Sequence, residues 1–280
     1  MTDAMLDVDH VTKDFVRGGL LSRQRIRAVD DVSFRLETGQ PEIFAIIGES
    51  GSGKSTLASM ILNIMQPSIG QLRYQGTDLA KIRGKSARRH FMAQVQPIFQ
   101  NPFEAFNPLK ELDHYLFMTA RRFIDGLDEA DAMRHADEAL VKVGLSLAEV
   151  RGRFPHELSG GQLQRVAVAR ALIPAPSIIV ADEPVSMVDA SLRMSIVNLF
   201  MKLRDDLGIS IIYITHDLAT AYYISDRIII MQRGKVVESG DARTVLATPQ
   251  HPYSQQLKSA VLMPDGTARD HSNNGGPSHA

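Results

Sequence analysis

A glycine-rich segment followed by a lysine and a serine is the first part of this chain that could do chemistry. It reads Gly48-Glu49-Ser50-Gly51-Ser52-Gly53-Lys54-Ser55, with Thr56 next, and it fits the phosphate-binding consensus G-x-x-x-x-G-K-[ST]. Glycines let successive N–H groups turn toward one anion. Lys54 can supply a positive charge to the β- and γ-phosphates of a nucleotide, and the Ser55 hydroxyl can ligate Mg²⁺. The alternative is an ordinary glycine-rich turn before a helix, which the preceding apolar run 43–47 disfavours.

Two adjacent carboxylates follow another apolar run. Asp182 and Glu183 come directly after residues 178–181, so both would leave the carboxyl end of a buried strand together. Asp182 could hold Mg²⁺, and Glu183 could polarise a water molecule that attacks the γ-phosphate. An isolated pair of this kind is just as often an acidic turn after a strand, so its meaning depends on the other motifs.

A third motif, Ser159-Gly160-Gly161-Gln162, follows Leu158 and precedes the helix-favouring run 162–172. It would present a hydroxyl, free N–H groups and a helix N-terminus to an anion. Taken alone it is an ordinary helix-capping turn. Between a phosphate loop and an Asp-Glu pair, it indicates a second element that contacts phosphate.

Three single residues follow predicted strands. His216 comes after the run 209–214, where its imidazole could donate to the γ-phosphate or to the attacking water. Gln100 follows the run 95–99, and Phe15 follows the first predicted strand. An aromatic ring at that place could stack on a nucleotide base, although packing in the core remains the alternative for Phe15.

The order and spacing of these motifs resemble those of the ATP-binding cassette (ABC) ATPases from about Leu6 to Val261. The resemblance implies ATP and Mg²⁺ as cofactors, and it implies that Ser55, Gln100 and Asp182 contact the metal ion. It implies catalytic roles for Glu183 and His216 and an adenine contact for Phe15. It also implies that residues 159–162 contact ATP held by a second subunit.

Short apolar runs separated by helix-length segments predict a layered α/β fold. The expected fold class is a P-loop NTPase core with a mostly parallel sheet, an N-terminal antiparallel β-subdomain over 6–11 and 25–37, and an inserted helical subdomain over about 101–172. The expected ATPase domain covers residues 1–262, and 263–280 form a disordered tail. The runs expected to build the core sheet are 43–47, 95–99, 178–181, 209–214 and 228–231.

Composition limits the remaining function classes. Lys plus Arg total 31 and Asp plus Glu total 32, which gives no basic field for a nucleic-acid partner. The chain has no cysteine, so it offers no disulfide, thiolate metal site or cysteine-ligated cluster. Neither a signal peptide nor an apolar run long enough to span a bilayer is visible. Any membrane role is therefore expected to come through a partner.

Three segments resemble the oligopeptide and dipeptide importer ATPases within that family, namely 17–27, 98–108 and 251–257. The Asn-Pro pair in the second and the His-Pro-Tyr start of the third are the most specific. The longer approach to the phosphate loop at 39–44 departs from that group. This resemblance implies an ATPase at the cytoplasmic face of the inner membrane, a second and non-identical ATPase subunit, two transmembrane permeases and, indirectly, an extracytoplasmic solute-binding protein. The alternatives are an ATPase accessory subunit of a carbon–phosphorus lyase and a regulatory or DNA-repair cassette ATPase.

Apolar residues just beyond Gln100 are expected to contact the permease. Phe103, Phe106 and Leu109 could form a groove for a short cytoplasmic helix, although packing inside the helical subdomain is the alternative for all three.

Overall fold

The computed structural model describes residues 4–17 and 24–262. The predicted disordered tail at 263–280 lies outside the described residues, and so does the stretch 18–23. In the described part of the chain, none of the helices is both long and apolar enough to cross a membrane.

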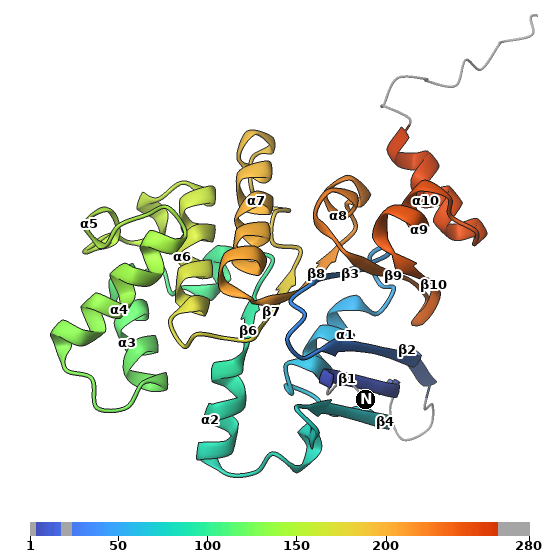
Figure 1. The fold of residues 1–280 in the computed structure, drawn as a ribbon, viewed down its shortest axis with the longest axis horizontal. Coiled ribbons are helices and arrows are strands. Elements are labelled where there is room, and N and C mark those ends of the chain that lie inside the picture. The colour runs from blue at the N-terminus through green and yellow to red at the C-terminus, as the bar shows by residue number, and fades with distance from the viewer. Residues whose placement is uncertain (1–3, 18–23, 263–280) are drawn as a thin grey trace, which may run out of the picture.

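A six-stranded sheet forms the centre of the molecule (Figure 1). Five of its strands coincide with the predicted runs, and the edge strand at Lys235–Asp241 was not predicted. Its strands pair in parallel, apart from one antiparallel strand at the edge. The central strands are apolar without alternation because layers cover both faces of the sheet. In spatial order the strands are β10 (Lys235–Asp241), β9 (Arg227–Gln232), β3 (Ile43–Ile47), β8 (Ser210–Thr215), β7 (Ile178–Asp182) and β6 (Val95–Ile98).

A second, antiparallel sheet holds the N-terminal part of the chain and lies below the first in Figure 1. Its first strand is longer than the predicted run 6–11. The register shifts near Val8 and Val11, and His10 has a positive φ of 49°, so the apolar alternation breaks while the pairing continues. The strands in order are β2 (Gln24–Glu37), β1 (Ala4–Arg17), β4 (Ile69–Tyr74) and β5 (Thr77–Asp78).

The two faces of β3 pack against different layers. Phe44 and Ile46 belong to a core shared with α1 (Lys54–Ile61) and the antiparallel sheet. Ala45 and Ile47 belong to another core, shared with helices from the C-terminal part of the chain. The remaining helices of these layers are α2 (Lys85–Gln94), α7 (Ala190–Leu207), α8 (Leu218–Ile224), α9 (Ala242–Ala247) and α10 (Pro252–Leu262).

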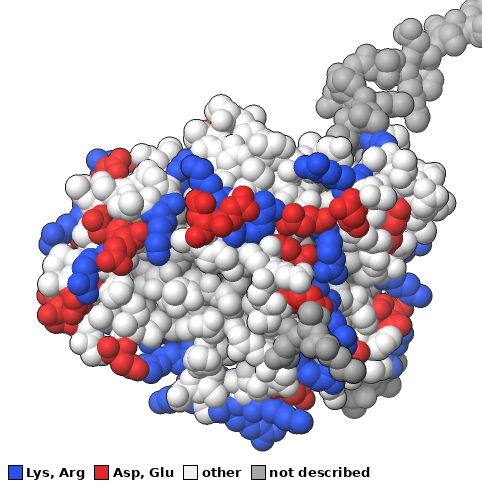
Figure 2. Space-filling model, viewed as in Figure 1, with Lys and Arg blue, Asp and Glu red and all other residues white. Residues whose placement is uncertain are grey.

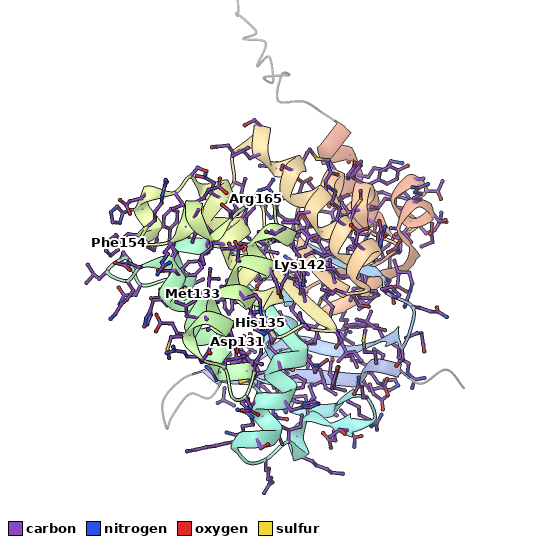
Figure 3. All side chains as sticks on the ribbon, turned by 60° about the vertical axis from the view of Figure 1, so that its left-hand side comes forward. Asp131, Met133, His135, Lys142, Phe154 and Arg165 are labelled. Carbon is purple, nitrogen blue, oxygen red and sulfur yellow. The ribbon has the colours of Figure 1, made fainter. Side chains whose placement is uncertain are left out.

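Four helices between β6 and β7 pack on one another at the left of Figure 1. Small residues on α4 (Ala132, Ala136 and Ala139) are buried and let its neighbours approach closely. Arg165, labelled in Figure 3, connects these helices to α7. Its guanidinium donates to the Val143 carbonyl and to the Ser195 hydroxyl of α7. The helices are α3 (Leu112–Phe123), α4 (Glu129–Lys142), α5 (Leu147–Val150) and α6 (Gly160–Leu172). Single 3₁₀ turns lie at Leu79–Lys81, Pro102–Ala105 and Pro155–Glu157.

The prediction that Phe103, Phe106 and Leu109 form a docking groove is wrong for Phe106. Phe106 is only 3% exposed. Its ring packs edge-on against Tyr115 and lies under the Arg170 guanidinium. Sequence could not distinguish an apolar residue on a surface loop from one that folds back into the helical core.

Charged side chains of both signs are interspersed over the face drawn in Figure 2, apart from a basic group at the bottom of the view. This distribution agrees with the formal net charge of −1. The surface seen there is not a continuous basic field of the kind that binds nucleic acid.

Candidate functional site

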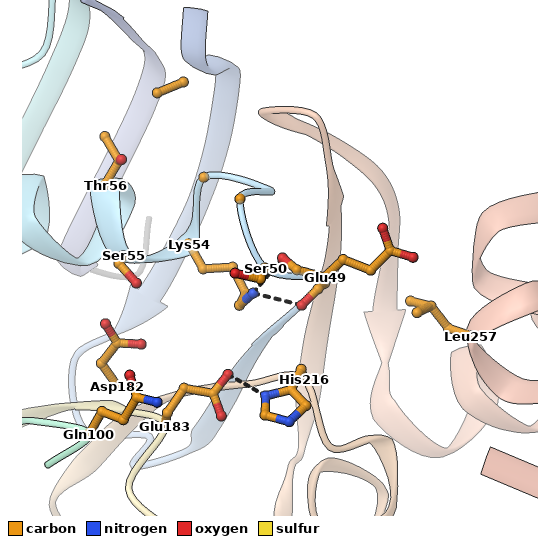
Figure 4. A pocket seen from close by; sticks show the side chains of 14 residues that line it. Glu49, Ser50, Lys54, Ser55, Thr56, Gln100, Asp182, Glu183, His216 and Leu257 are labelled. Atoms are coloured by element: carbon orange, nitrogen blue, oxygen red, sulfur yellow. Dashed lines mark hydrogen bonds and ion pairs between the residues drawn. The ribbon is translucent and has the colours of Figure 1, made fainter. Parts of the chain in front are cut away.

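The carboxyl ends of four neighbouring strands meet at one cavity of about 590 Å³ (Figure 4). The loop after β3 forms one wall, and residues that follow β6, β7 and β8 form the opposite wall. In an open α/β sheet this edge is where ligands bind. The cavity is lined by Ala28, Gly48, Glu49, Ser50, Gly51, Gly53, Lys54, Ser55, Thr56, Gln100, Asp182, Glu183, His216 and Leu257.

Two glycines of the loop are required by close backbone contacts. A Cβ on Gly48 would lie 2.2 Å from the Met231 carbonyl oxygen, and one on Gly53 would lie 2.2 Å from the Ala28 carbonyl oxygen. Gly53 also has a φ of 105°, which side-chain-bearing residues rarely adopt. The loop can therefore wrap closely over the start of α1 and direct its N–H groups into the cavity.

Lys54 is held by the loop itself. Its ammonium donates to the carbonyl oxygen of Gly48 at 2.6 Å and to that of Glu49 at 2.8 Å, and the residue is only 6% exposed. Burial lowers the pKa of Lys54, and the charges of Glu183 and Asp182 oppose that effect. An ammonium has three donors, and acceptors among the described residues take two of them, which leaves the third for an anion in the cavity.

Asp182, Ser55 and Gln100 together offer oxygen ligands for a hard cation. Asp182 has a buried carboxylate oxygen, Oδ1, without a hydrogen-bond partner among the described residues. Burial raises the pKa of Asp182, and a hydrogen bond with Ser55 opposes the rise. A buried carboxylate oxygen is costly unless something compensates its charge. This donor set fits Mg²⁺, which prefers oxygen ligands and takes few of them from the protein when phosphates supply the rest.

Glu183 and His216 form a second pair in the cavity. The carboxylate Oε1 of Glu183 lies 2.7 Å from Nδ1 of His216. Glu183 has a positive φ of 50°, and its N–H donates to the Ile214 carbonyl at 2.8 Å. This strained backbone turns the chain at the end of β7, and the Glu183 side chain extends into the cavity beside Asp182 (Figure 4).

Several residues predicted for the site lie elsewhere in this single chain. Phe15, on β1, is partly exposed under the Lys13 ammonium and does not line the cavity. Ser52 is buried inside the loop, and its hydroxyl finds no partner among the described residues. The motif 159–162 lies at the start of α6 and does not line the cavity either.

The motif 159–162 is ordered by its own capping interactions. The Ser159 hydroxyl accepts from the Gln162 N–H at 3.3 Å, and the Gln162 side chain accepts from the Ser159 N–H at 3.1 Å. The helix begins at Gly160, two residues before the predicted start. A Cβ on Gly161 would lie 2.9 Å from Leu192 of α7, so the glycine keeps α6 close to α7.

Sequence reasoning missed three residues around the loop. Ala28 and Leu257 line the cavity, and the hydroxyl of Tyr253 accepts a hydrogen bond from the Glu49 N–H at 2.9 Å. The sequence distinguishes the His-Pro-Tyr segment only through its resemblance to the importer ATPases. Nothing in its local pattern indicates a contact with a loop 204 residues earlier.

Comparison with known proteins points to one family. The family model described as ABC transporter matches residues 29–186. A probable peptide ABC transporter ATP-binding protein of Sinorhizobium fredii is 38% identical over 95% of this chain and 74% of its own length. The dipeptide transport ATP-binding protein DppF of Escherichia coli is 40% identical over 89% of this chain and 74% of its own length.

Solved structures of cassette ATPases share the fold. A dimeric ATP-binding cassette in a post-hydrolysis state, bound to ADP and Pi, superposes with a TM-score of 0.73 at 28% identity, covering 85% of this chain and 99% of that one. CbiO1 of Clostridium perfringens, part of an ABC transporter complex, gives 0.73 at 25% identity, covering 88% of this chain and 91% of that one.

Asp182→Asn is expected to raise the melting temperature of the nucleotide-free protein and to abolish Mg²⁺-dependent ATP hydrolysis. Because burial raises the pKa of Asp182 in the folded state, its ionised form lowers stability above that pKa. This cost disappears as the pH falls through the folded pKa. Calorimetry should therefore show a gap between variant and wild type that is largest at neutral pH and shrinks in acid. A variant that melts below wild type at neutral pH would contradict this assignment.

Proposed function

The chain belongs to the ABC transporter family of ATP-binding proteins, and on that premise we propose that it binds and hydrolyses ATP to drive an importer for peptides or a related small solute. One observation carries the proposal: the Lys54 loop faces Asp182 and Glu183 across a single cavity. The names of the relatives, which refer to peptide and dipeptide transport, support the cargo class. We place the protein at the cytoplasmic face of the inner membrane.

ATP would lie with its phosphates along the loop. The Ser52 N–H already donates to the Glu49 carbonyl at 3.1 Å. The other N–H groups of residues 50–55 and the third donor of Lys54 would bind the β- and γ-phosphate oxygens. Ser55, Asp182 and Gln100 would hold Mg²⁺, which would neutralise charge on those phosphates. Phe15 is proposed to contact the adenine from β1.

Glu183 is the proposed catalytic carboxylate. It would orient the attacking water and accept its proton, while the 2.7 Å contact with His216 fixes the direction of the carboxylate. His216 is well exposed at the cavity, and with both ring nitrogens protonated it would in addition donate through Nε2 to the γ-phosphate. Together the pair would place the water in line with the bond that breaks.

The motif 159–162 is proposed to complete the site of a second ATPase subunit. It lies outside the cavity of its own chain, yet it presents a helix N-terminus on α6. The dimeric form of a structural neighbour supports such pairing. We propose a non-identical homologue as the second subunit, because the chain resembles importers that use two different ATPases.

A groove beside α3 is the proposed docking surface for a transmembrane permease. Its volume is about 690 Å³, and it is lined by exposed apolar side chains such as Met92, Phe99 and Met118 together with Arg121 and Arg122. This lining fits a short cytoplasmic helix of the permease. The apolar face of that helix would pack on the groove, and either an acidic residue or the carbonyls at its C-terminus would contact the two arginines. Two such permeases, fed by an extracytoplasmic solute-binding protein, would form the importer.

Glu183→Gln is expected to retain ATP binding and to lower the hydrolysis rate about 10²-fold or more, since general base catalysis contributes about 10²–10⁴-fold. The amide keeps the shape of the side chain but cannot accept the proton. Phosphate release and equilibrium nucleotide binding, measured on the same preparation, separate the two effects. Hydrolysis near the wild-type rate would rule out Glu183 as the base.

Met118→Asp is expected to abolish solute uptake in a reconstituted importer while the isolated subunit still folds and binds ATP. Met118 is 53% exposed in the groove, so the charge meets the docked helix and not the core. Val141→Asp is the matched control, because Val141 is 62% exposed on α4 and does not line this groove. Phe106→Asp should instead prevent folding. Normal uptake by the Met118 variant would contradict the docking site.

A further inference from the structure

The C-terminal helix α10 contacts the phosphate loop on the side away from the catalytic carboxylates. We propose that Tyr253 is a positioning residue, whose hydroxyl fixes the peptide plane between Gly48 and Glu49 and thereby preorganises the loop for ATP. The inference rests on the proposed binding of ATP at this loop. It gives the His-Pro-Tyr segment a role in setting nucleotide affinity.

One peptide unit links Tyr253 to the phosphate-binding lysine. Its N–H, from Glu49, donates to the Tyr253 hydroxyl at 2.9 Å. Its carbonyl, from Gly48, accepts from the Lys54 ammonium at 2.6 Å. A peptide group is planar, so fixing the N–H also fixes the direction of the carbonyl. The Tyr253 hydroxyl therefore helps to determine where the lysine charge lies.

The Tyr253 ring is itself held firmly. The residue is only 4% exposed and packs in the core that contains Ile47, the last residue of β3, together with Leu218 and Ile230. Burial raises the pKa of the Tyr253 hydroxyl above its ordinary value, so the group stays neutral at physiological pH. A packed, neutral phenol provides a fixed hydrogen-bond acceptor for the loop.

The start of α10 is anchored to β10. Both carboxylate oxygens of Glu238 accept backbone N–H groups, from Gln250 at 2.8 Å and from His251 at 3.2 Å. Nδ1 of His251 then accepts the Tyr253 N–H at 3.2 Å. The N–H groups of His251 and Tyr253 are among those that a helix start leaves without intrahelical partners. The capping interactions thus place Tyr253 relative to the sheet that carries the loop.

A second residue on the same face of α10 reaches the cavity. Leu257 comes four residues after Tyr253, which brings it to the same side of the helix, and it lines the cavity beyond Glu49 (Figure 4). The helix therefore touches the nucleotide site twice, through a hydroxyl on the loop and an apolar side chain at the rim.

A loop that Tyr253 preorganises should bind ATP more tightly than the same loop without the Tyr253 hydroxyl. A loop that is already fixed loses less conformational freedom when ATP binds, so affinity should fall when the restraint is removed. If Tyr253 served only to fill the core, its ring would be sufficient and its hydroxyl would not affect ATP binding.

The test compares full-length wild type with Tyr253→Phe, which keeps the ring and removes the hydroxyl. Isothermal titration with a non-hydrolysable ATP analogue and Mg²⁺ should show a dissociation constant raised about fivefold, the equivalent of one hydrogen bond of about 1 kcal/mol. Hydrogen exchange at the Glu49 amide should accelerate by a similar factor or more. Tyr223→Phe is the control, because that hydroxyl donates to Asn198 at 3.1 Å on another surface.

Wild-type affinity and wild-type Glu49 exchange in Tyr253→Phe would overturn the inference while leaving ATP binding intact. An equal loss of affinity in Tyr223→Phe would overturn it too, since the effect would then not be specific to the loop. If the wild-type chain failed to bind the analogue, the proposed ATP function would fail first, and the inference with it.

Discussion

Burial of opposite charges on facing walls of one cavity is the constraint on which the rest of the structure depends. Lys54 is nearly inaccessible and donates to loop carbonyls, whereas Asp182 keeps a buried carboxylate oxygen without a partner among the described residues. Neither arrangement is favourable in isolation. A polyphosphate bound together with a divalent cation would compensate both, which explains why the protein holds these charges apart.

The fold maintains this separation through parallel strands that end at one edge. The phosphate loop follows β3, whereas Asp182 ends β7 and Glu183 follows it, two strands away with β8 between them. Each strand is fixed by apolar cores on both faces. The loop also contacts the C-terminal helix through Tyr253. The geometry of the site therefore depends on segments from most of the chain, and substitutions far from the cavity can alter it.

The sequence predicted the features that depend on local pattern. Short apolar runs predicted five of the six strands of the central sheet but not the edge strand β10, and the glycine, lysine and carboxylate motifs lie on the cavity walls. It could not predict long-range packing. Phe106 is equally apolar in a groove or a core, and only the fold places it under Arg170. The contact between Tyr253 and Glu49 joins positions with no periodic relation.

We propose that ATP is enclosed between the loop of one chain and residues 159–162 of another. Trapping orthovanadate with Mg²⁺ in the assembled transporter tests it directly, because ultraviolet light then cleaves the backbone wherever vanadate replaces the γ-phosphate. The account predicts that a tagged copy of this chain is cut both within residues 48–55 and at Ser159. Cleavage confined to residues 48–55 would contradict the composite site.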